Sequence, residues 1–233
     1  MKGRWFFVAL GLVALAVATS AFAPSLLDGS QRRAPITPLV AAHAGFMASW
    51  LLLFLVQAWL GARGRFRFHR RLGFASLALA AGVVSTGCLS TVAMVRRGFD
   101  LSGDLSRPPA SALDQAVFQF GSMVTFTVLV ATAIVLRHRP GVHKRLMALA
   151  VIQVMMAAPL AHLVGHFELP GLILPAWGVA VVSAFVVYDR RSRGRIHPAT
   201  VWGGIGLVIF NNVQFAVIGP SEPWQRVLAW IAM

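Results

Sequence analysis

Residues 38–62 read PLVAAHAGFMASWLLLFLVQAWLGA, a run without a single Lys, Arg, Asp or Glu. An α-helix needs about 20 predominantly apolar residues to cross the hydrocarbon layer of a bilayer. Such runs are too long and too continuously apolar for barrel strands, so we expect an all-α, polytopic membrane helix bundle in a single domain, residues 1–233. Counting all runs of this kind, the sequence predicts seven transmembrane helices: 5–23, 38–62, 72–95, 116–136, 146–167, 169–188 and 198–219.

The overall composition agrees with a membrane protein. Of the 233 residues, 58% are hydrophobic and 12% are charged, whereas a soluble domain carries about a quarter charged residues. Cys88 is the single cysteine, which excludes an internal disulfide and a zinc site built on cysteines. The sequence contains no phosphate-binding glycine loop and no Ser-His-Asp arrangement, so it assigns no catalytic residue.

The charges predict the orientation of the bundle. With the N-terminus inside, the inner segments contain 15 of the 21 basic residues and only one acidic residue, Asp189. Cytoplasmic loops of membrane proteins carry such an excess of Lys and Arg, so we expect an inside N-terminus and an outside C-terminus, and no nucleic-acid partner. The inner basic residues are Lys2, Arg4, Arg63, Arg65, Arg67, Arg70, Arg71, Arg137, Arg139, Lys144, Arg145, Arg190, Arg191, Arg193 and Arg195.

The first predicted helix could instead be a signal peptide. Lys2 and Arg4 precede an apolar run that ends in the sequence AFA at 21–23, which is similar to a cleavage site. Pro24 would then be the first mature residue, a position that signal peptidases handle poorly. We therefore favour a retained membrane anchor, while cleavage would leave six helices with the same orientation.

Three inner loops repeat the pattern Arg-x-Arg-x3-His, which ends at His69, His143 and His197. The first two copies agree further, because 69–72 (HRRL) matches 143–146 (HKRL). Each loop joins an inward helix to an outward helix. We therefore expect one N-terminal helix followed by three helical hairpins.

Histidines also lie in the outer half of the predicted bundle. His43 is near the outer end of 38–62, while His162 and His166 share one face in the last turns of 146–167. Imidazoles from two helices can ligate a haem iron, and all three could bind a metal ion such as copper if haem is absent. We rank His43 and His162 first as ligands of haem b, with His166 as a further candidate. Alternatively, these histidines bond only water, backbone or neighbouring amides.

The residues around His43 indicate which side of its helix is buried. A stripe at helical spacing contains His43, Met47, Trp50, Phe54 and Gln57. Because it includes polar groups at both ends, we expect this stripe to face protein rather than lipid.

Two further sets of polar residues are open to more than one interpretation. His69, His143 and His197 at the inner boundary are second-choice cofactor ligands, or they contact the phosphates of anionic lipid head groups together with the surrounding arginines. The other set would line an outward-facing pocket of a transporter or of a lipid- or small-molecule-binding protein. It consists of Gln119, Asn211, Asn212 and Gln214.

The inner loops also carry a resemblance to a known family. The segments 69–73 (HRRLG) and 143–147 (HKRLM), with His43 and the turn 196–198 (IHP), resemble a family of uncharacterised bacterial multi-pass inner-membrane proteins. The resemblance covers the second to seventh helices and implies the fold and an inner-membrane location, but no activity. The bundle also resembles, loosely, the b-type membrane cytochromes. Our leading hypothesis is a haem-binding electron-transfer protein, and the rivals are a non-redox transporter or lipid-binding protein and a structural subunit of a membrane complex.

Overall fold

The computed structural model describes residues 3–29, 36–97, 112–156 and 170–233, and within these ranges every regular element is a helix. The predicted ligands His162 and His166 lie outside the described residues, as does the end of the predicted helix 146–167. In chain order the elements are α1 (Phe6–Leu27), α2 (Pro38–Ala62), α3 (Phe66–Arg97), α4 (Ala112–Val135), α5 (Pro140–Val151), the π-helix η2 (Ile152–Met156), α7 (Pro170–Arg193), α8 (Pro198–Val213), the π-helix η3 (Gln214–Ile218) and α9 (Glu222–Ala232).

The all-α class and the membrane-spanning character predicted from the sequence are confirmed. Predicted and observed bounds agree for α2, whereas α3 begins at Phe66, before the predicted start at Leu72. The basic segment 66–71 joins this helix because arginine is a good helix former whose long side chain can reach a polar boundary. Among the described residues, five stretches are long and apolar enough to cross a membrane: Phe6–Pro24, Pro38–Ala62, Phe66–Arg96, Ala116–Val135 and Pro198–Ile218.

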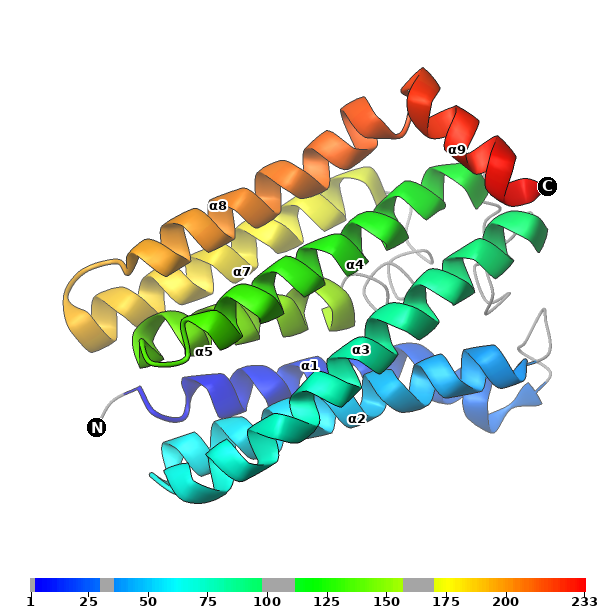
Figure 1. Ribbon diagram of the computed structural model, residues 1–233. Coiled ribbons are helices and arrows are strands. Elements are labelled where there is room, and N and C mark those ends of the chain that lie inside the picture. The colour runs from blue at the N-terminus through cyan, green and yellow to red at the C-terminus, as the bar shows by residue number, and fades with distance from the viewer. Residues whose placement is uncertain (1–2, 30–35, 98–111, 157–169) are drawn as a thin grey trace.

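The helices form one bundle whose basic loops lie at the same end (Figure 1). This end, which we call the basic end, contains the start of α1 and the turns 63–65, 136–139 and 194–197. Helix α9 and the C-terminus lie at the opposite end. The three loops with the Arg-x-Arg-x3-His pattern therefore share one end of the bundle.

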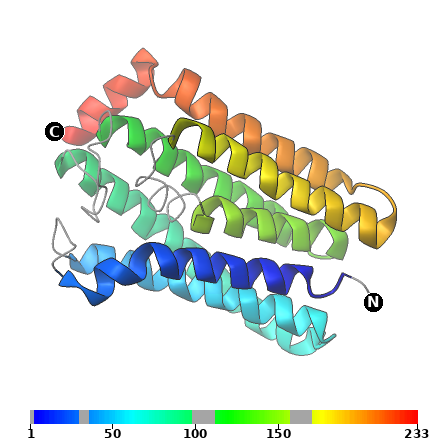
Figure 2. The same ribbon diagram turned by 180° about the vertical axis from the view of Figure 1, so that it is seen from behind.

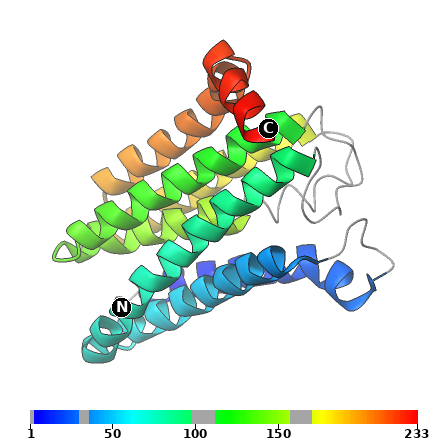
Figure 3. The same cartoon turned by 45° about the vertical axis from the view of Figure 1, so that its right-hand side comes forward.

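Helices that follow one another in the chain are mostly neighbours in space. α2 packs along α3, α3 along α4 and α4 along α5, while α7 pairs with α8. α3 runs obliquely from α2 at the basic end to α4 and α9 at the other end (Figure 3). α1 lies beside α2, on the side of the bundle away from α8 (Figure 2), and it also contacts α5 and η2. The first helix is therefore packed against several others.

Aromatic side chains join the helices across the interior. The predicted stripe of α2 faces the protein, since Trp50 is 1% exposed and Phe54 is 7% exposed. The Trp50 ring meets the edge of Phe126 in α4 with centroids 5.0 Å apart. Towards the basic end, Phe6 of α1 stacks on Tyr188 of α7 at 4.4 Å. These contacts hold α2 to α4 and α1 to α7.

The turn between α2 and α3 depends on Gly64, whose φ of 72° lies in the left-handed region. Gly64 N donates to Gly61 O and Arg65 N donates to Leu60 O, the hydrogen-bond pattern of a Schellman motif at a helix C-terminus. Glycine adopts this φ without steric cost because it has no Cβ. The turn therefore places Arg65 at the basic end, directly before α3.

Two π-helices follow α-helices inside the bundle, η2 after α5 and η3 after α8. π-helical turns are rare and are frequently found at functional sites. Each carries a buried glutamine, since Gln153 in η2 is 2% exposed and Gln214 in η3 is fully buried. The π-helical turns therefore coincide with polar side chains in the interior.

Candidate functional site

The structure brings together two of the three repeated histidines. His69 lies near the start of α3 and His143 near the start of α5, and their ring centroids are 6.2 Å apart with the ring planes at 86°. Two imidazoles that each bind one metal ion through one nitrogen have centroids roughly 6 Å apart, because metal–nitrogen bonds are about 2 Å long. The spacing of this second-choice pair is therefore compatible with a shared metal ion.

Backbone carbonyls hold both rings. His143 Nδ1 lies 2.8 Å from Ala133 O, and His69 Nδ1 lies 3.3 Å from Gln57 O. In return, Gln57 Nε2 donates to His69 O at 3.1 Å. Because a carbonyl oxygen only accepts, each Nδ1 carries a proton and donates it. In the neutral ring Nε2 then keeps a lone pair, which is the arrangement in which proteins present histidine to a metal.

The third repeated histidine has a different role. His197 is the N-cap of α8, and its Nδ1 accepts a hydrogen bond from Ala199 N at 3.0 Å. Burial lowers the pKa of His197, and the nearby positive charges of Arg145 and Arg193 lower it further. A neutral ring with an unprotonated Nδ1 suits this cap. His197 is therefore committed to the start of α8, unlike His69 and His143.

A buried ion pair connects the helices around His197. Arg145 of α5 and Asp189 of α7 are bonded through Nη2 and Oδ1, with Arg145 Nε also 3.1 Å from Oδ1, and neither side chain is exposed. Asp189 Oδ2 accepts from Thr200 Oγ1 at 2.6 Å and from His197 N at 2.9 Å. Burial alone would raise the pKa of Asp189, but the hydrogen bonds from Arg145, Thr200 and His197 outweigh it, so the pKa is lowered. The sole acidic residue of the inner segments is therefore neutralised within the protein.

Of the three predicted outer histidines, His43 lies within the described residues, whereas His162 and His166 lie outside them. His43 Nδ1 lies 3.0 Å from Thr86 Oγ1 in α3, and the Thr86 hydroxyl donates to Gly82 O at 2.6 Å. Since the threonine hydrogen is committed to the carbonyl, His43 Nδ1 donates to the hydroxyl oxygen. His43 therefore connects α2 to α3.

Gly87 of α3 allows His43 to approach Met123 of α4. A Cβ at Gly87 would lie 3.3 Å from His43 Cε1 and 2.6 Å from Met123 Sδ, so both side chains occupy the space beside this glycine. Imidazole and thioether are both known iron and copper ligands. Within the described ranges, however, no group of three or more His, Cys, Asp or Glu side chains could hold a metal ion.

Two of the predicted pocket residues, Asn211 and Gln214, belong to a buried network of amides. The side chains of Gln153 and Asn211 donate to each other at 2.9 and 3.0 Å. Gln153 also lies 3.3 Å from Ser122 Oγ in α4, and Gln214 Nε2 donates to Asn211 Oδ1 at 3.0 Å. Such interhelical hydrogen bonds satisfy polar groups inside a membrane bundle. The network therefore connects α4, η2, α8 and η3.

The other two predicted pocket residues lie elsewhere. Asn212 is exposed and donates to Val208 O in its own helix at 2.8 Å. Gln119 accepts from Thr91 Oγ1 at 3.1 Å, and its Nε2 lies 3.5 Å from Met94 Sδ. The four predicted residues are thus distributed over three separate places.

Sequence reasoning did not single out Gln153, Arg145 or Asp189 as members of buried networks. A signal existed for Gln153, an amide within an otherwise apolar run, and for Asp189, the sole acid among many bases. Arg145 gave no signal, because it resembles every other arginine of the inner loops.

Comparisons of the chain with protein-family models, with curated proteins and with solved structures find no match. The resemblance to the bacterial inner-membrane family therefore stays an expectation. The strongest guide to the function of this chain is the geometry of its histidines.

Proposed function

We propose that this chain is a multi-pass protein of the bacterial inner membrane that binds haem b and transfers electrons. The proposed topology has seven transmembrane helices, an inside N-terminus and an outside C-terminus. In this topology α5 with η2 and α7 supply two crossings beyond the five candidate spans. The gathering of the basic loops at one end supports the orientation, because Lys and Arg concentrate in cytoplasmic loops.

The observation that carries the haem proposal is the pairing of His69 with His143 at a centroid distance of 6.2 Å. Each ring is held by a carbonyl at Nδ1, and no hydrogen bond to either Nε2 is found within the part of the chain that the structure describes. Neutral imidazole nitrogen is the usual protein ligand of haem iron. The donor set therefore supports a haem b at the basic end, while His43 and His162 stay the candidates for the outer half.

The surrounding residues would serve the bound group in two ways. The carbonyls of Gln57 and Ala133 fix the rotation of the two rings. Exposed arginines near the two histidines in sequence, such as Arg70 in the first turns of α3 and Arg139 at the N-cap of α5, would offer planar donors for the carboxylates of a haem. The haem itself supplies one-electron oxidation and reduction. In the proposed topology the site lies at the inner membrane boundary, within reach of a cytoplasmic electron donor or acceptor.

The test is an absorption spectrum of the protein purified in mild detergent after expression with a haem precursor. We expect a Soret band that shifts on reduction with dithionite, together with sharp α and β bands. His69→Ala and His143→Ala should each lose these bands. His138→Ala is the matched control, because His138 is an exposed histidine in the turn between α4 and α5, and its spectrum should equal that of the wild type.

The variant His43→Ala distinguishes the inner site from the outer one. Loss of the bands in His43→Ala, with both inner variants unchanged, would contradict the assignment to His69 and His143. A colourless, metal-free and folded wild-type protein would overturn the haem proposal altogether. The rival functions, a transporter, a lipid- or small-molecule-binding protein or a structural subunit, would then come first.

A further inference from the structure

The repeat places two arginines at equivalent positions with different surroundings. Arg71 follows His69 by two residues, as Arg145 follows His143. Arg145 is fully buried and is neutralised by the Asp189 carboxylate. Arg71 is exposed, and no ion pair to it is found within the described ranges. Among the described residues, Arg71, on the α2–α3 hairpin, therefore lacks a counterpart of the Asp189 carboxylate, which pairs with Arg145 on the α4–α5 hairpin.

The composition of the basic end explains why none of the side chains that the structure describes fills this role. Asp189 is the sole acidic residue of the predicted inner segments, and both of its oxygens already accept hydrogen bonds from Arg145, Thr200 and His197. An anion beside Arg71 would therefore have to come from outside the part of the chain that the structure describes.

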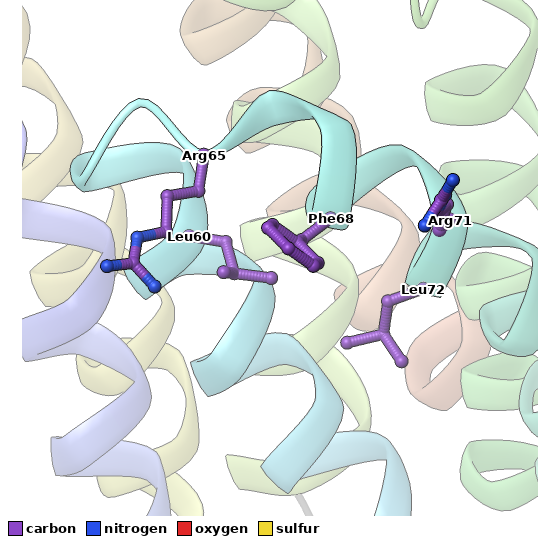
Figure 4. A pocket seen from close by; sticks show the side chains of 5 residues that line it. All are labelled: Leu60, Arg65, Phe68, Arg71 and Leu72. Carbon is purple, nitrogen blue, oxygen red and sulfur yellow. The ribbon is translucent and has the colours of Figure 1, made fainter.

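A hollow lies next to Arg71 on the α2–α3 hairpin (Figure 4). Its apolar part is formed by Leu60, Phe68 and Leu72, and in the figure Leu60 and Phe68 point towards each other. Arg65 and Arg71 stand on opposite sides of these apolar side chains. Phe68 is 56% exposed. The hollow therefore combines an apolar floor with two positive charges.

The position of Arg65 is maintained by its neighbours. The Schellman turn at Gly64 sets its backbone, and its guanidinium carbon lies 5.6 Å from the centre of the Trp59 ring. Trp5 and Trp59 both lie at the basic end and both contact Arg63. Tryptophans concentrate where the hydrocarbon layer meets the head groups, so this level of the bundle suits a lipid with its phosphate at the arginines.

We propose that the hollow formed by Leu60, Arg65, Phe68, Arg71 and Leu72 binds one anionic glycerophospholipid. The head-group phosphate takes the place beside Arg71 that the Asp189 carboxylate takes beside Arg145. Arg65 adds a second positive charge, and the acyl chains lie on the apolar floor. This site does not depend on whether the protein binds haem.

The test is native mass spectrometry of the purified protein titrated with phosphatidylglycerol, and with phosphatidylcholine of the same acyl chains. We expect one molecule of phosphatidylglycerol to be retained in preference to phosphatidylcholine. The double variant Arg65→Gln/Arg71→Gln should weaken this binding roughly thirtyfold, which corresponds to the combined contribution of two basic residues to binding at an anionic membrane surface. Phe68→Ala should also weaken it, although both charges remain.

The matched control is Arg67→Gln/Arg70→Gln, which removes the same charge from the same segment but from residues that do not line the hollow. It should leave binding within about twofold of the wild type. An equal loss in both double variants would overturn the proposal, because it would indicate diffuse attraction by surface charge. Equal retention of the two lipids, or full displacement by glycerol 3-phosphate, would overturn it as well. Unchanged melting temperatures would show that each variant is folded.

Discussion

Arg145 of α5 and Asp189 of α7 form an ion pair from which solvent is completely excluded. The two residues are 44 positions apart in the chain. Together with Thr200 and His197, the pair links α5, α7 and the start of α8 at the basic end of the bundle. A charged side chain is tolerated at a fully buried position only with a counter-ion, because transferring each ion out of water costs free energy. This relationship yields predictions that do not depend on the proposed function.

Removing one partner of the pair should destabilise the protein strongly. Arg145→Met leaves the Asp189 carboxylate buried without its counter-ion, and we expect a loss of about 3–5 kcal/mol in the free energy of unfolding. Arg145→Met/Asp189→Asn should recover part of this loss, because it removes the unpaired buried charge while the Asn oxygen can still accept from His197 N and Thr200 Oγ1. Unfolding in mixed detergent micelles measures both values.

The control for this prediction is the second ion pair of the described residues, Arg226 with Glu222 on α9. Its side chains are 77% and 76% exposed, and exposed pairs contribute little. Arg226→Gln should therefore leave the unfolding curve unchanged. A loss in Arg226→Gln equal to that in Arg145→Met would contradict the special role of burial.

The stability should fall in acid through Asp189. Its pKa is lowered in the folded protein, so the unfolded chain binds this proton more readily than the folded state. The stabilisation by the carboxylate is complete above the ordinary pKa of 3.8 and is lost as the pH falls through the lowered value. Melting temperatures from pH 6 to pH 2 should show this decline in the wild type and not in Asp189→Asn. Glu222→Gln, on the exposed α9 pair, should keep the decline.

A second decline should begin at milder pH because of His197. Its pKa is lowered by burial and by Arg145 and Arg193, with Lys144 contributing and Asp189 opposing. The stabilisation is therefore full above the ordinary value of 6.5 and is lost as the pH falls from there through the lowered pKa.

The capping role of His197 allows a matched pair of variants. His197→Ala removes the acceptor for Ala199 N and should cost about 1 kcal/mol, whereas His197→Asn keeps an N-cap acceptor and should retain most of the stability. In melting-temperature profiles, both variants should show a smaller decline than the wild type as the pH falls below 6.5, with the remainder arising from His69, whose pKa is also lowered by burial. A decline as large as that of the wild type in either variant would exclude His197 as a source.

The contact between Gly121 and Gln214 predicts a coupled pair of substitutions. A Cβ at Gly121 would collide with the side-chain amide of Gln214, whose Cδ it would approach to 2.9 Å. This amide cannot move away without losing its hydrogen bond to Asn211. Gly121→Ala should therefore lower the free energy of unfolding by about 1–3 kcal/mol. In Gln214→Ala the same glycine substitution should cost much less. Gly206→Ala, which meets no atom within 4 Å, is the control and should be neutral or slightly stabilising.

Several features of the fold are determined by local sequence. The bounds of α2 were predicted because an uncharged apolar run defines its length, and in the structure Thr37 is the N-cap and Pro38 the first residue of this helix. The start of α3 was predicted too late, because the hydropathy of the segment 66–71 is low although its helix propensity is high. The stripe of α2 was predicted to face protein, and its central residues Trp50 and Phe54 are buried.

The candidate site could be predicted only in part. The repeat singled out His69, His143 and His197 as equivalent, yet the structure separates them. Two rings donate Nδ1–H to the carbonyls of Gln57 and Ala133, and the third accepts at Nδ1. No sequence pattern reveals which atom of a ring a neighbouring helix will present to it.

The sequence alone determined the all-helical class, the membrane-spanning runs and the collection of basic residues in the loops that form one end of the bundle. These properties are local, since the length of an apolar run and the charge of a loop do not depend on other helices. The tertiary structure decided that His69 meets His143, that Arg145 finds Asp189 and that Arg71 lies beside a hollow instead. Each of these depends on how helices far apart in the chain pack, because packing determines which side chains are within hydrogen-bonding distance.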